Sequence, residues 1–317
     1  MKTLAVDDDH SIRELLPMIL AEAGIMDVTV AESADHALDL IAAQTEPFEC
    51  FLLDIQMPGA SGIELCAAVR QMPAYRKTPI IMLTAMTEKS YVDGAFVAGA
   101  TDYITKPFDI FEVSVRIGMA NRLAAEQRRV RELTSDAVVP NAVTDADPPA
   151  GFSDRLEIEG VKGLVIWPVF ENYLGQLSRA GLQSSTFFAV HVLGGERIYS
   201  QSTPSEFEFA IRHVADAIAM SSMSGAVVMC YVGNGNFLCS SNAAALQSTA
   251  SLEWDIQGVV DEKELCKDDG TPFDLEVAVG AALQPLLSQP VNLNALKEQA
   301  LRRAMVRVRE KMPYQEV

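Results

Sequence analysis

Several polar residues in the N-terminal third each come directly after a short apolar run. They are Asp7, Asp8, Asp54, Thr84 and Lys106. Apolar runs of this length that are bounded by turn residues are typical of buried parallel strands. Ligands of an open parallel sheet bind at the carboxyl ends of its strands, so the sequence predicts three carboxylates, a hydroxyl and an ammonium around one crevice.

The residue types in this crevice favour phosphoryl transfer. Three clustered carboxylates repel one another unless a cation joins them, and a hard divalent ion such as Mg2+ suits such an oxygen-rich pocket. A phosphoryl group on Asp54 would share its charge with the metal, the Lys106 ammonium and the Thr84 hydroxyl. Alone, Asp54 would be read as a helix cap and Lys106 as a solvated loop lysine, but their spacing predicts one site with Asp54 as the acceptor.

The sequence around these residues carries a family resemblance. Asp54 is followed by Ile55-Gln56-Met57-Pro58-Gly59, Thr84 by Ala85, and Lys106 lies within Thr105-Lys106-Pro107-Phe108. In this order and at this spacing, the motifs resemble the receiver domain of two-component response regulators over residues 1 to about 125. The resemblance implies an α/β fold of the flavodoxin-like type, with a doubly wound, parallel, five-stranded sheet.

The resemblance also implies a role for each residue. Four residues would surround Mg2+: Asp7, Asp8, Asp54 and, through its backbone carbonyl, Gln56. Asp54 would accept a phosphoryl group from a sensor histidine kinase or a phosphotransfer protein, and Lys106 would contact that group. Thr84 and Tyr103 would switch with it and carry the change to a distant surface. The Lys106-Pro107 bond would be cis.

Composition limits the remaining possibilities. At 317 residues, 49% of them hydrophobic, the chain is long enough for two domains. Residues 1–150 hold 12 basic and 23 acidic residues and residues 151–317 hold 13 and 20, so neither half predicts the basic face that nucleic-acid binding requires. No apolar run reaches membrane-span length and no signal segment opens the chain. We therefore expect a cytoplasmic protein that binds neither nucleic acid nor a membrane.

A long helix and a linker separate the two halves. Residues 108 to about 133 predict one helix that overruns the receiver-like region. Positions spaced three and four apart from Val113 to Thr134 are typical either of a weak coiled-coil seam, which would support a homodimer, or of an ordinary amphipathic helix. Pro140, Pro148 and Pro149 then lie among small and acidic residues, which is linker composition. The predicted division is a receiver with its extended helix at 1–133, a linker at 134–152 and a second domain at 153–317.

The second half alternates helical and strand-like stretches. Helices are expected at residues 168–180, 204–220 and 293–310, and strands at 186–193, 226–232, 237–239 and 275–282. The Gly233-Asn234-Gly235-Asn236 segment suits a tight turn between the two middle strands. This order predicts an α+β domain in which helices cover a largely antiparallel sheet.

Residues 153–317 resemble the GGDEF family of diguanylate cyclases. The resemblance lies in Ile211-Arg212-His213-Val214-Ala215, Gly233-Asn234-Gly235-Asn236-Phe237, Val277-Ala278-Val279-Gly280, Gln299-Ala300-Leu301 and Ala304. It implies the ferredoxin-like palm fold of that family. It also places the family's inhibitory arginine-x-x-aspartate motif at residues 224–227, where the sequence lacks it.

The residues that would perform cyclase chemistry are replaced. The family's metal aspartate falls at His191, its acidic pair at Gly235 and Asn236, and its guanine-contacting asparagine at Tyr199, while Glu208 keeps a carboxylate. Glycine and amide side chains cannot hold the metal ions of a cyclase, so these departures imply a catalytically inactive domain.

We therefore expect a two-component response regulator that is not an enzyme. Its phosphorylated receiver would control a GGDEF-like domain that acts by binding another protein. One alternative is a second domain that still makes or senses a cyclic dinucleotide or binds a nucleotide. Another is a phosphate sink whose second domain only stabilises a dimer.

Overall fold

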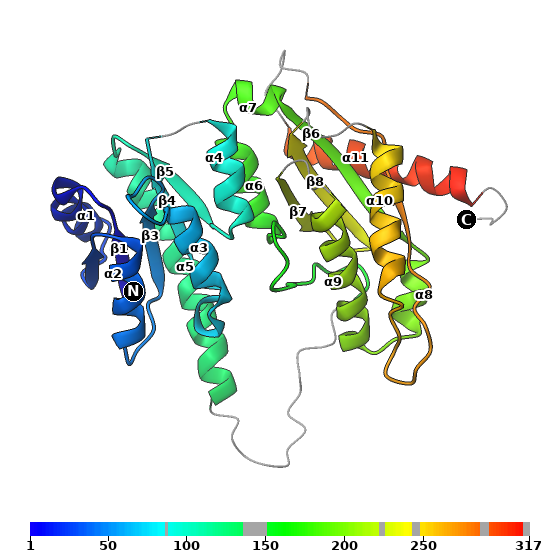
Figure 1. Ribbon diagram of the computed structural model, residues 1–317, viewed down its shortest axis with the longest axis horizontal. Helices are drawn as coiled ribbons and strands as arrows, with labels where there is room; N and C mark the ends of the chain where they lie inside the picture. Colours follow the sequence, from blue (N-terminus) through cyan, green and yellow to red (C-terminus); the bar gives the residue numbers. More distant parts are fainter. Residues whose placement is uncertain (86–87, 136–150, 222–225, 243–247, 286–291, 313–317) are drawn as a thin grey trace. The chain divides into compact units, whose positions relative to one another are not determined.

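The computed structural model describes residues 1–85, 88–135, 151–221, 226–242, 248–285 and 292–312. Residues 136–150, the greater part of the predicted linker, lie outside the described residues, as do positions 224 and 225 of the segment that lacks the inhibitory motif. The chain divides into two units, residues 1–144 and 145–317, and each unit contains its own sheet (Figure 1). This division falls within the predicted linker.

Five parallel strands and the helices between them form the first unit. The strands are β1 (Thr3–Val6), β2 (Val28–Ala31), β3 (Cys50–Asp54), β4 (Ile80–Thr84) and β5 (Asp102–Thr105). The helices are α1 (His10–Glu22), α2 (Ala34–Ala43), α3 (Gly62–Gln71), the 3-10 helix η1 (Pro73–Tyr75), α4 (Lys89–Val97) and α5 (Ile110–Ser135). The sheet order is β2-β1-β3-β4-β5, so the strand order reverses beside β1 and β3. The predicted doubly wound, flavodoxin-like fold is confirmed.

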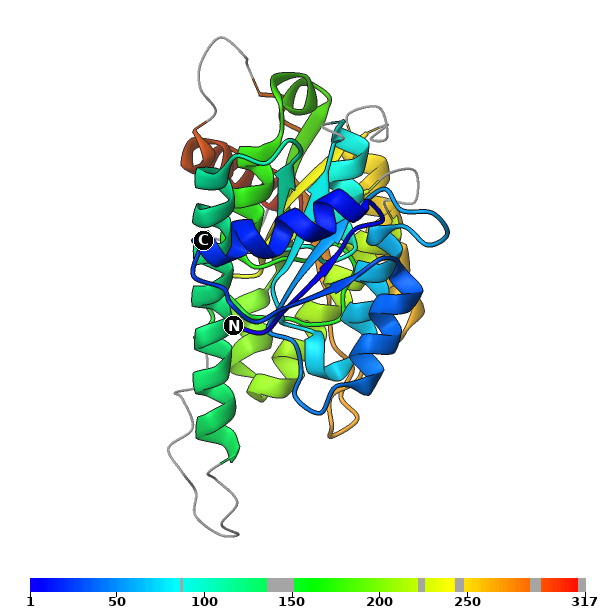
Figure 2. The ribbon, with the colours of Figure 1, turned by 90° about the vertical axis from the view of Figure 1, so that its left-hand side faces the viewer.

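Burial on both faces of the sheet explains the apolar runs. Every residue of β1, β3 and β4 is buried, as expected for parallel strands covered by helices on each side. Helices α1 and α5 lie together against one face of the sheet (Figure 2). Their core side chains contact those of the strands. The register pairs Val6 with Leu53, Asp54 with Leu83, and Thr84 with Thr105, so the carboxyl ends of four strands are level.

Helix α5 begins two residues later than predicted and continues to Ser135. Its first seam positions, Val113 and Ala120, are buried in the core of the first unit. This part of the helix therefore packs as an ordinary amphipathic helix, and a dimeric seam here is not supported. The side chains of the later seam positions, Leu123, Gln127, Val130 and Thr134, lie outside the described residues.

The second unit is built around an antiparallel sheet. Its elements are α6 (Trp167–Gln176), α7 (Arg179–Gln183), β6 (Ser185–Leu193), α8 (Gly195–Ser200), α9 (Pro204–Ser221), β7 (Val227–Tyr231), β8 (Asn236–Asn242), α10 (Thr249–Glu262), β9 (Glu276–Val279) and α11 (Leu293–Lys311). The sheet order is β7-β8-β6-β9, and all three pairings are antiparallel. Strands and the main helices follow one another as β6-α9-β7-β8-α10-β9, the order of a split βαβ unit. The predicted α+β class is confirmed.

Apolar side chains of α9 and α10 form a core with alternate residues of the sheet, including Phe188, Val190 and Val192. Three consecutive residues with positive φ, Gly233, Asn234 and Gly235, make the turn between β7 and β8. Glycine adopts this conformation without steric cost, so the predicted tight hairpin is confirmed.

Several sequence predictions for the second unit were inaccurate, since α8 was not expected and β8 is longer than residues 237–239. The helix expected over 168–180 is two helices, because Leu177 is extended and Ser178 caps α7. The last strand is only Glu276–Val279. Helix α10 was not predicted, although Ser248 caps it and Leu252, with Ile256 and Val260, recurs on its buried face. Among the described helices, none has the length and apolar character needed to cross a membrane.

Candidate functional site

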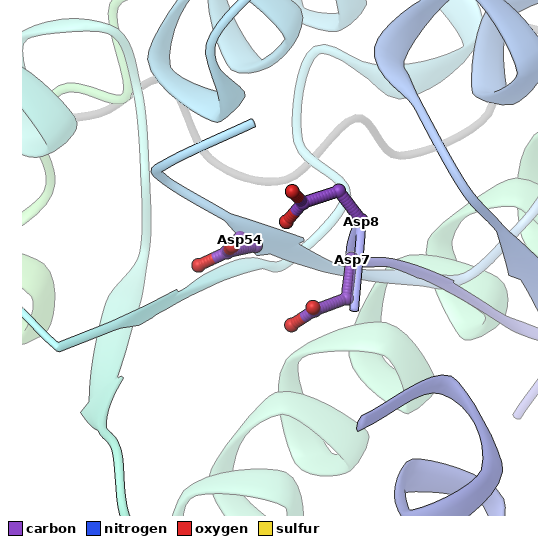
Figure 3. Close-up of side chains that lie close together, drawn as sticks. All are labelled: Asp7, Asp8 and Asp54. Atoms are coloured by element: carbon purple, nitrogen blue, oxygen red, sulfur yellow. The ribbon is translucent and has the colours of Figure 1, made fainter. Parts of the chain in front are cut away.

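Three carboxylates gather at the carboxyl ends of β1 and β3. Asp7 and Asp54 are buried and Asp8 is exposed, and one oxygen from each lies within 4.8 Å of the others. The three side chains extend to the same side of the strand ends (Figure 3). A cluster of carboxylate oxygens with one side open to solvent is the donor set that Mg2+ prefers, so the residues fit the expected ion.

Lys106 joins two of these carboxylates. Its Nζ atom lies 2.7 Å from Asp7 Oδ2 and 3.1 Å from Asp54 Oδ1. The loop after β5 brings it there from the other end of the domain sequence. The backbone N–H of Lys106 donates to the Thr84 carbonyl at 2.7 Å, which fixes that loop to the end of β4.

The charges around the pocket shift its pKa values. Burial raises the pKa of Asp54 above its ordinary value of 3.8, the Lys106 ammonium opposes this shift, and the Asp7 carboxylate adds to it. Burial disfavours charged Lys106, but its hydrogen bond to Asp7 and the charge of Asp54 outweigh burial, so the pKa of Lys106 is raised. The charged form of Lys106 is therefore favoured and the charged form of Asp54 is disfavoured, and a divalent cation would offset the penalty on Asp54.

Two residues that sequence reasoning missed support the pocket. Arg13 donates to the carbonyl oxygens of Asp7 and Asp8, each at 2.8 Å. Gly62 begins α3 so close to β3 that a Cβ atom there would lie 2.0 Å from the Asp54 carbonyl oxygen. Arg13 lies one turn after the N-cap Asp9, and this position could have predicted that its side chain reaches back to the end of β1. The local sequence around Gly62 does not indicate that a side chain there would meet β3.

Comparison with known proteins agrees with this geometry. The model of the response regulator receiver domain matches residues 3–118. Residues 3–118 form a response regulator receiver domain.

Curated relatives share this domain. The chain is 42% identical over 126 residues to the transcriptional regulatory protein ResD of Bacillus subtilis, a match that covers 39% of this chain and 50% of ResD. It is 36% identical over 139 residues to the transcriptional regulatory protein SrrA of Staphylococcus aureus, covering 44% of this chain and 53% of SrrA. The chain thus spans about half the length of these relatives.

A solved structure of the Vibrio cholerae chemotaxis protein CheY4 aligns with 33% identity and a TM-score of 0.35, covering 38% of this chain and 97% of CheY4.

The remaining predicted receiver residues are Thr84, Tyr103 and Gln56. Thr84 ends β4 and is 1% exposed, and Tyr103 in β5 is 5% exposed. Burial raises the pKa of Tyr103, so its hydroxyl stays protonated. Gln56 is exposed in the loop that follows Asp54. The Lys106-Pro107 bond is cis, as the resemblance implied.

In the second unit, the structure brings two of the predicted positions together. His191 and Asn236 face each other across β6 and β8, with 2.9 Å between His191 Nδ1 and Asn236 Oδ1. The Asn236 amide nitrogen donates to the carbonyls of Gly233 and Asn234, so its oxygen is the acceptor and His191 Nδ1 is the donor. Burial lowers the pKa of His191, which favours the neutral ring. The two side chains therefore satisfy each other.

The other three predicted positions are Tyr199, Glu208 and Gly235. Tyr199 packs on Phe207, with ring centroids 5.1 Å apart, and Glu208 is exposed. Gly235 donates its N–H to the Tyr231 hydroxyl and has a φ of +69°. Within the described ranges, Asp7, Asp8 and Asp54 form the one group of histidine, cysteine and carboxylate side chains close enough to hold a metal.

The basic residues of α11 have a structural role that the sequence did not reveal. Arg307 pairs with the buried Glu253 of α10 at 2.8 Å, and Lys311 lies 3.5 Å from the same carboxylate. Glu253 also accepts the backbone N–H of Val279 at 2.9 Å. Lys311 further donates to the Val277 carbonyl. These cations therefore tie α10 and α11 to the edge strand β9.

Proposed function

We propose that this protein is a two-component response regulator whose receiver domain takes one phosphoryl group on Asp54 in the presence of Mg2+. The observation that carries the proposal is the position of Lys106, which pairs with both Asp7 and Asp54 beside the exposed Asp8 carboxylate. Cation and carboxylates together form a pocket suited to a transferred phosphoryl group.

The chemistry follows from the named groups. A carboxylate oxygen of Asp54 attacks the phosphorus of the donor, and the bond from phosphorus to the leaving group breaks as the new P–O bond forms. Lys106, already 3.1 Å from Asp54, pairs with an oxygen of the transferred group. When bound through Asp7, Asp8, Asp54 and the Gln56 carbonyl, Mg2+ supplies the charge that offsets the phosphoryl oxygens.

The phosphodonor would be a sensor histidine kinase or a phosphotransfer protein. Phosphorylation adds about −1.5 to −2 charge near neutral pH, which favours movement of the Thr84 hydroxyl toward the phosphoryl group. Tyr103, one strand away in the same sheet, would then carry the change to the surface near α5.

We further propose that the second unit is a GGDEF-like domain without cyclase activity, and that it acts by binding another protein. The main support is the pairing of His191 with Asn236, because an imidazole and an amide that bond each other offer Mg2+ no carboxylate oxygen. The alternative, a domain that retains cyclase activity or binds a nucleotide, would require other residues to hold the metal ions.

ResD and SrrA are named transcriptional regulatory proteins, but we propose no nucleic-acid binding for this chain. Arg307 and Lys311, which would be expected to contribute to a basic face, are engaged with Glu253 instead.

Intact mass measurement tests the receiver assignment. Wild-type protein, Asp54→Asn and the control Asp35→Asn, which changes an exposed aspartate on α2, are incubated with a small phosphodonor, with and without Mg2+. Wild type and Asp35→Asn should gain one phosphoryl group only with Mg2+, and Asp54→Asn should gain none. Equal labelling of Asp54→Asn would refute the assignment.

Turnover of GTP tests the second unit. The full chain, phosphorylated or not, is incubated with GTP and either Mg2+ or Mn2+, and we expect no cyclic dinucleotide. Detectable product would overturn the inactive-domain proposal and favour the enzyme alternative, without affecting the assignment of Asp54. Capture of partners by wild type and by Asp54→Asn, each with phosphodonor, then identifies the output.

A further inference from the structure

Strand β9 lies at the end of the second sheet, and its outer edge pairs with none of the described strands. In an antiparallel pair, alternate residues direct their backbone N–H and C=O groups away from the partner strand. In β9 and just before it, the residues that do so are Leu275, Val277 and Val279. An edge of this kind is a template for pairing with another strand unless something covers its backbone groups.

The side chain of Gln257 in α10 covers part of this edge in the way that a peptide unit would. Its Nε2 atom donates to the Leu275 carbonyl and its Oε1 atom accepts the Val277 N–H, each at 3.0 Å. The second N–H of the amide donates to the Asp261 carboxylate at 2.7 Å, which fixes the orientation of the amide. A primary amide carries both a donor and an acceptor, so one side chain satisfies two backbone groups of the edge.

Two charged side chains cover the rest of the edge. Lys311 of α11 donates to the Val277 carbonyl at 2.7 Å, and its Nζ atom lies 2.9 Å from the Glu276 carboxylate and 3.5 Å from that of Glu253. Glu253 of α10 in turn accepts the Val279 N–H at 2.9 Å. Side chains from two helices therefore occupy the positions that the backbone of a neighbouring strand would otherwise take.

The geometry at Val277 indicates which strand would fit this edge. Both its N–H and its C=O point outward, so a two-fold axis beside Val277 would pair these groups with the same two groups of a second copy of the chain. Such a pair is antiparallel and uses one surface twice, so it requires no other protein. The edge is open to solvent beside Glu276, whose side chain is 47% exposed. Gln257 and Lys311 hold the two groups that this pairing would use.

We propose that the outer edge of β9 is a self-pairing surface, which Gln257 and Lys311 keep closed. When both side chains leave Val277, β9 pairs with β9 of a second copy and the two sheets become continuous. The hydrogen bonds that the two side chains make with Val277 compete directly with those of the second copy, so they set the concentration at which copies associate. The partner that this edge fits is therefore a second copy of this chain.

Sedimentation of the full chain tests the proposal. The opened variant, Gln257→Ala with Lys311→Ala, is compared with wild type and with a control, Lys263→Ala with Gln299→Ala, which changes two exposed residues of the same types. The opened variant should have about twice the mass of the other two proteins. Adding Val277→Pro removes the outward N–H without breaking the ladder with β6, and it should restore the mass of wild type. An opened variant with the mass of wild type, or one whose larger mass Val277→Pro leaves unchanged, would overturn the proposal.

Hydrogen exchange at the Val277 amide reports the edge directly. In the opened variant it should be roughly tenfold faster than in wild type in dilute solution, and it should slow as the protein concentration rises. Unchanged exchange at amides of β8 shows that the second unit remains folded. The milder variant Gln257→Ala, which keeps Lys311, should show a smaller change in the same direction. Exchange at Val277 that does not depend on concentration in either variant would contradict self-pairing. The result is separate from the proposed function, because labelling of Asp54 is read in the other unit.

Discussion

Removal of the Lys106 ammonium offers a direct test of the charge balance in the receiver pocket. Lys106→Met keeps a long apolar side chain but leaves Asp7 and Asp54 without their shared cation. The Nζ atom lies 2.7 Å and 3.1 Å from their oxygens, distances at which each attraction is about 5–6 kcal/mol at an effective dielectric constant near 20.

Desolvation of the charged groups offsets much of that attraction. Variants that break buried ion pairs typically lose about 3–5 kcal/mol of stability, because an unpaired charge is left behind. The Lys106 side chain is 19% exposed, so we expect a loss near the lower end, about 3 kcal/mol in the free energy of unfolding of the first unit.

Magnesium should reverse most of this loss. An ion present at about a hundredfold excess over its dissociation constant stabilises a protein by about 2.7 kcal/mol, and the variant should gain more than wild type because its carboxylates lack a cation. Acidification should also reduce the loss. The pKa of Asp54 is already raised and would rise further without Lys106, so protonation removes the repulsion at a higher pH.

Native-state hydrogen exchange at amides of β3 and β4 measures the stability of the first unit separately from the second. Lys77→Met, which changes an exposed lysine outside the pocket, is the control. A loss below about 1 kcal/mol for Lys106→Met would show that solvent already screens these charges. Equal stabilisation of wild type and variant by Mg2+ would show that the ion does not bind beside these carboxylates.

Three further predictions concern single residues. Gly62→Ala should lower the stability of the first unit by about 3 kcal/mol and slow labelling of Asp54, because the new Cβ would meet a carbonyl 2.0 Å away; unchanged exchange and labelling would refute this. Arg307→Met should destabilise the second unit by about 2 kcal/mol in thermal melts at neutral pH. Burial opposes ionisation of Glu253, but its hydrogen bonds to Arg307 and Val279 outweigh burial, so its pKa lies below the ordinary value of 4.5. Protonation of Glu253 removes the ion pair, so the difference in stability between Arg307→Met and wild type should vanish as the pH drops below 4.5. A difference that persists there would contradict the ion pair. Thr84→Ala should still be phosphorylated but show a weaker change in hydrogen exchange at α4 and α5, and an undiminished change would exclude its switch role.

The carboxylates and the lysine of the receiver pocket could be predicted from the sequence because each of them follows a local signal. An apolar run predicts a buried strand, and the polar residue after it predicts a side chain at the carboxyl end of that strand. Parallel strands place these ends at one edge, so Asp54 and Lys106 could be brought together without knowledge of the contacts between them. The turn at Gly233 was equally local, because positive φ angles favour glycine whatever the surrounding fold.

The tertiary structure alone decided which charged and aromatic side chains contact each other in the folded protein. Glu253 and Arg307 are 54 positions apart, and Phe152, whose carbonyl accepts the Asn234 N–H, is farther still from its partner, so no spacing in the sequence connects them. A charged residue on a predicted helix is expected to face solvent unless the element that packs against it is known. Hydrogen bonds and ion pairs between distant segments depend on the packing of whole elements, and this packing leaves no periodic pattern in the residues that make the contacts.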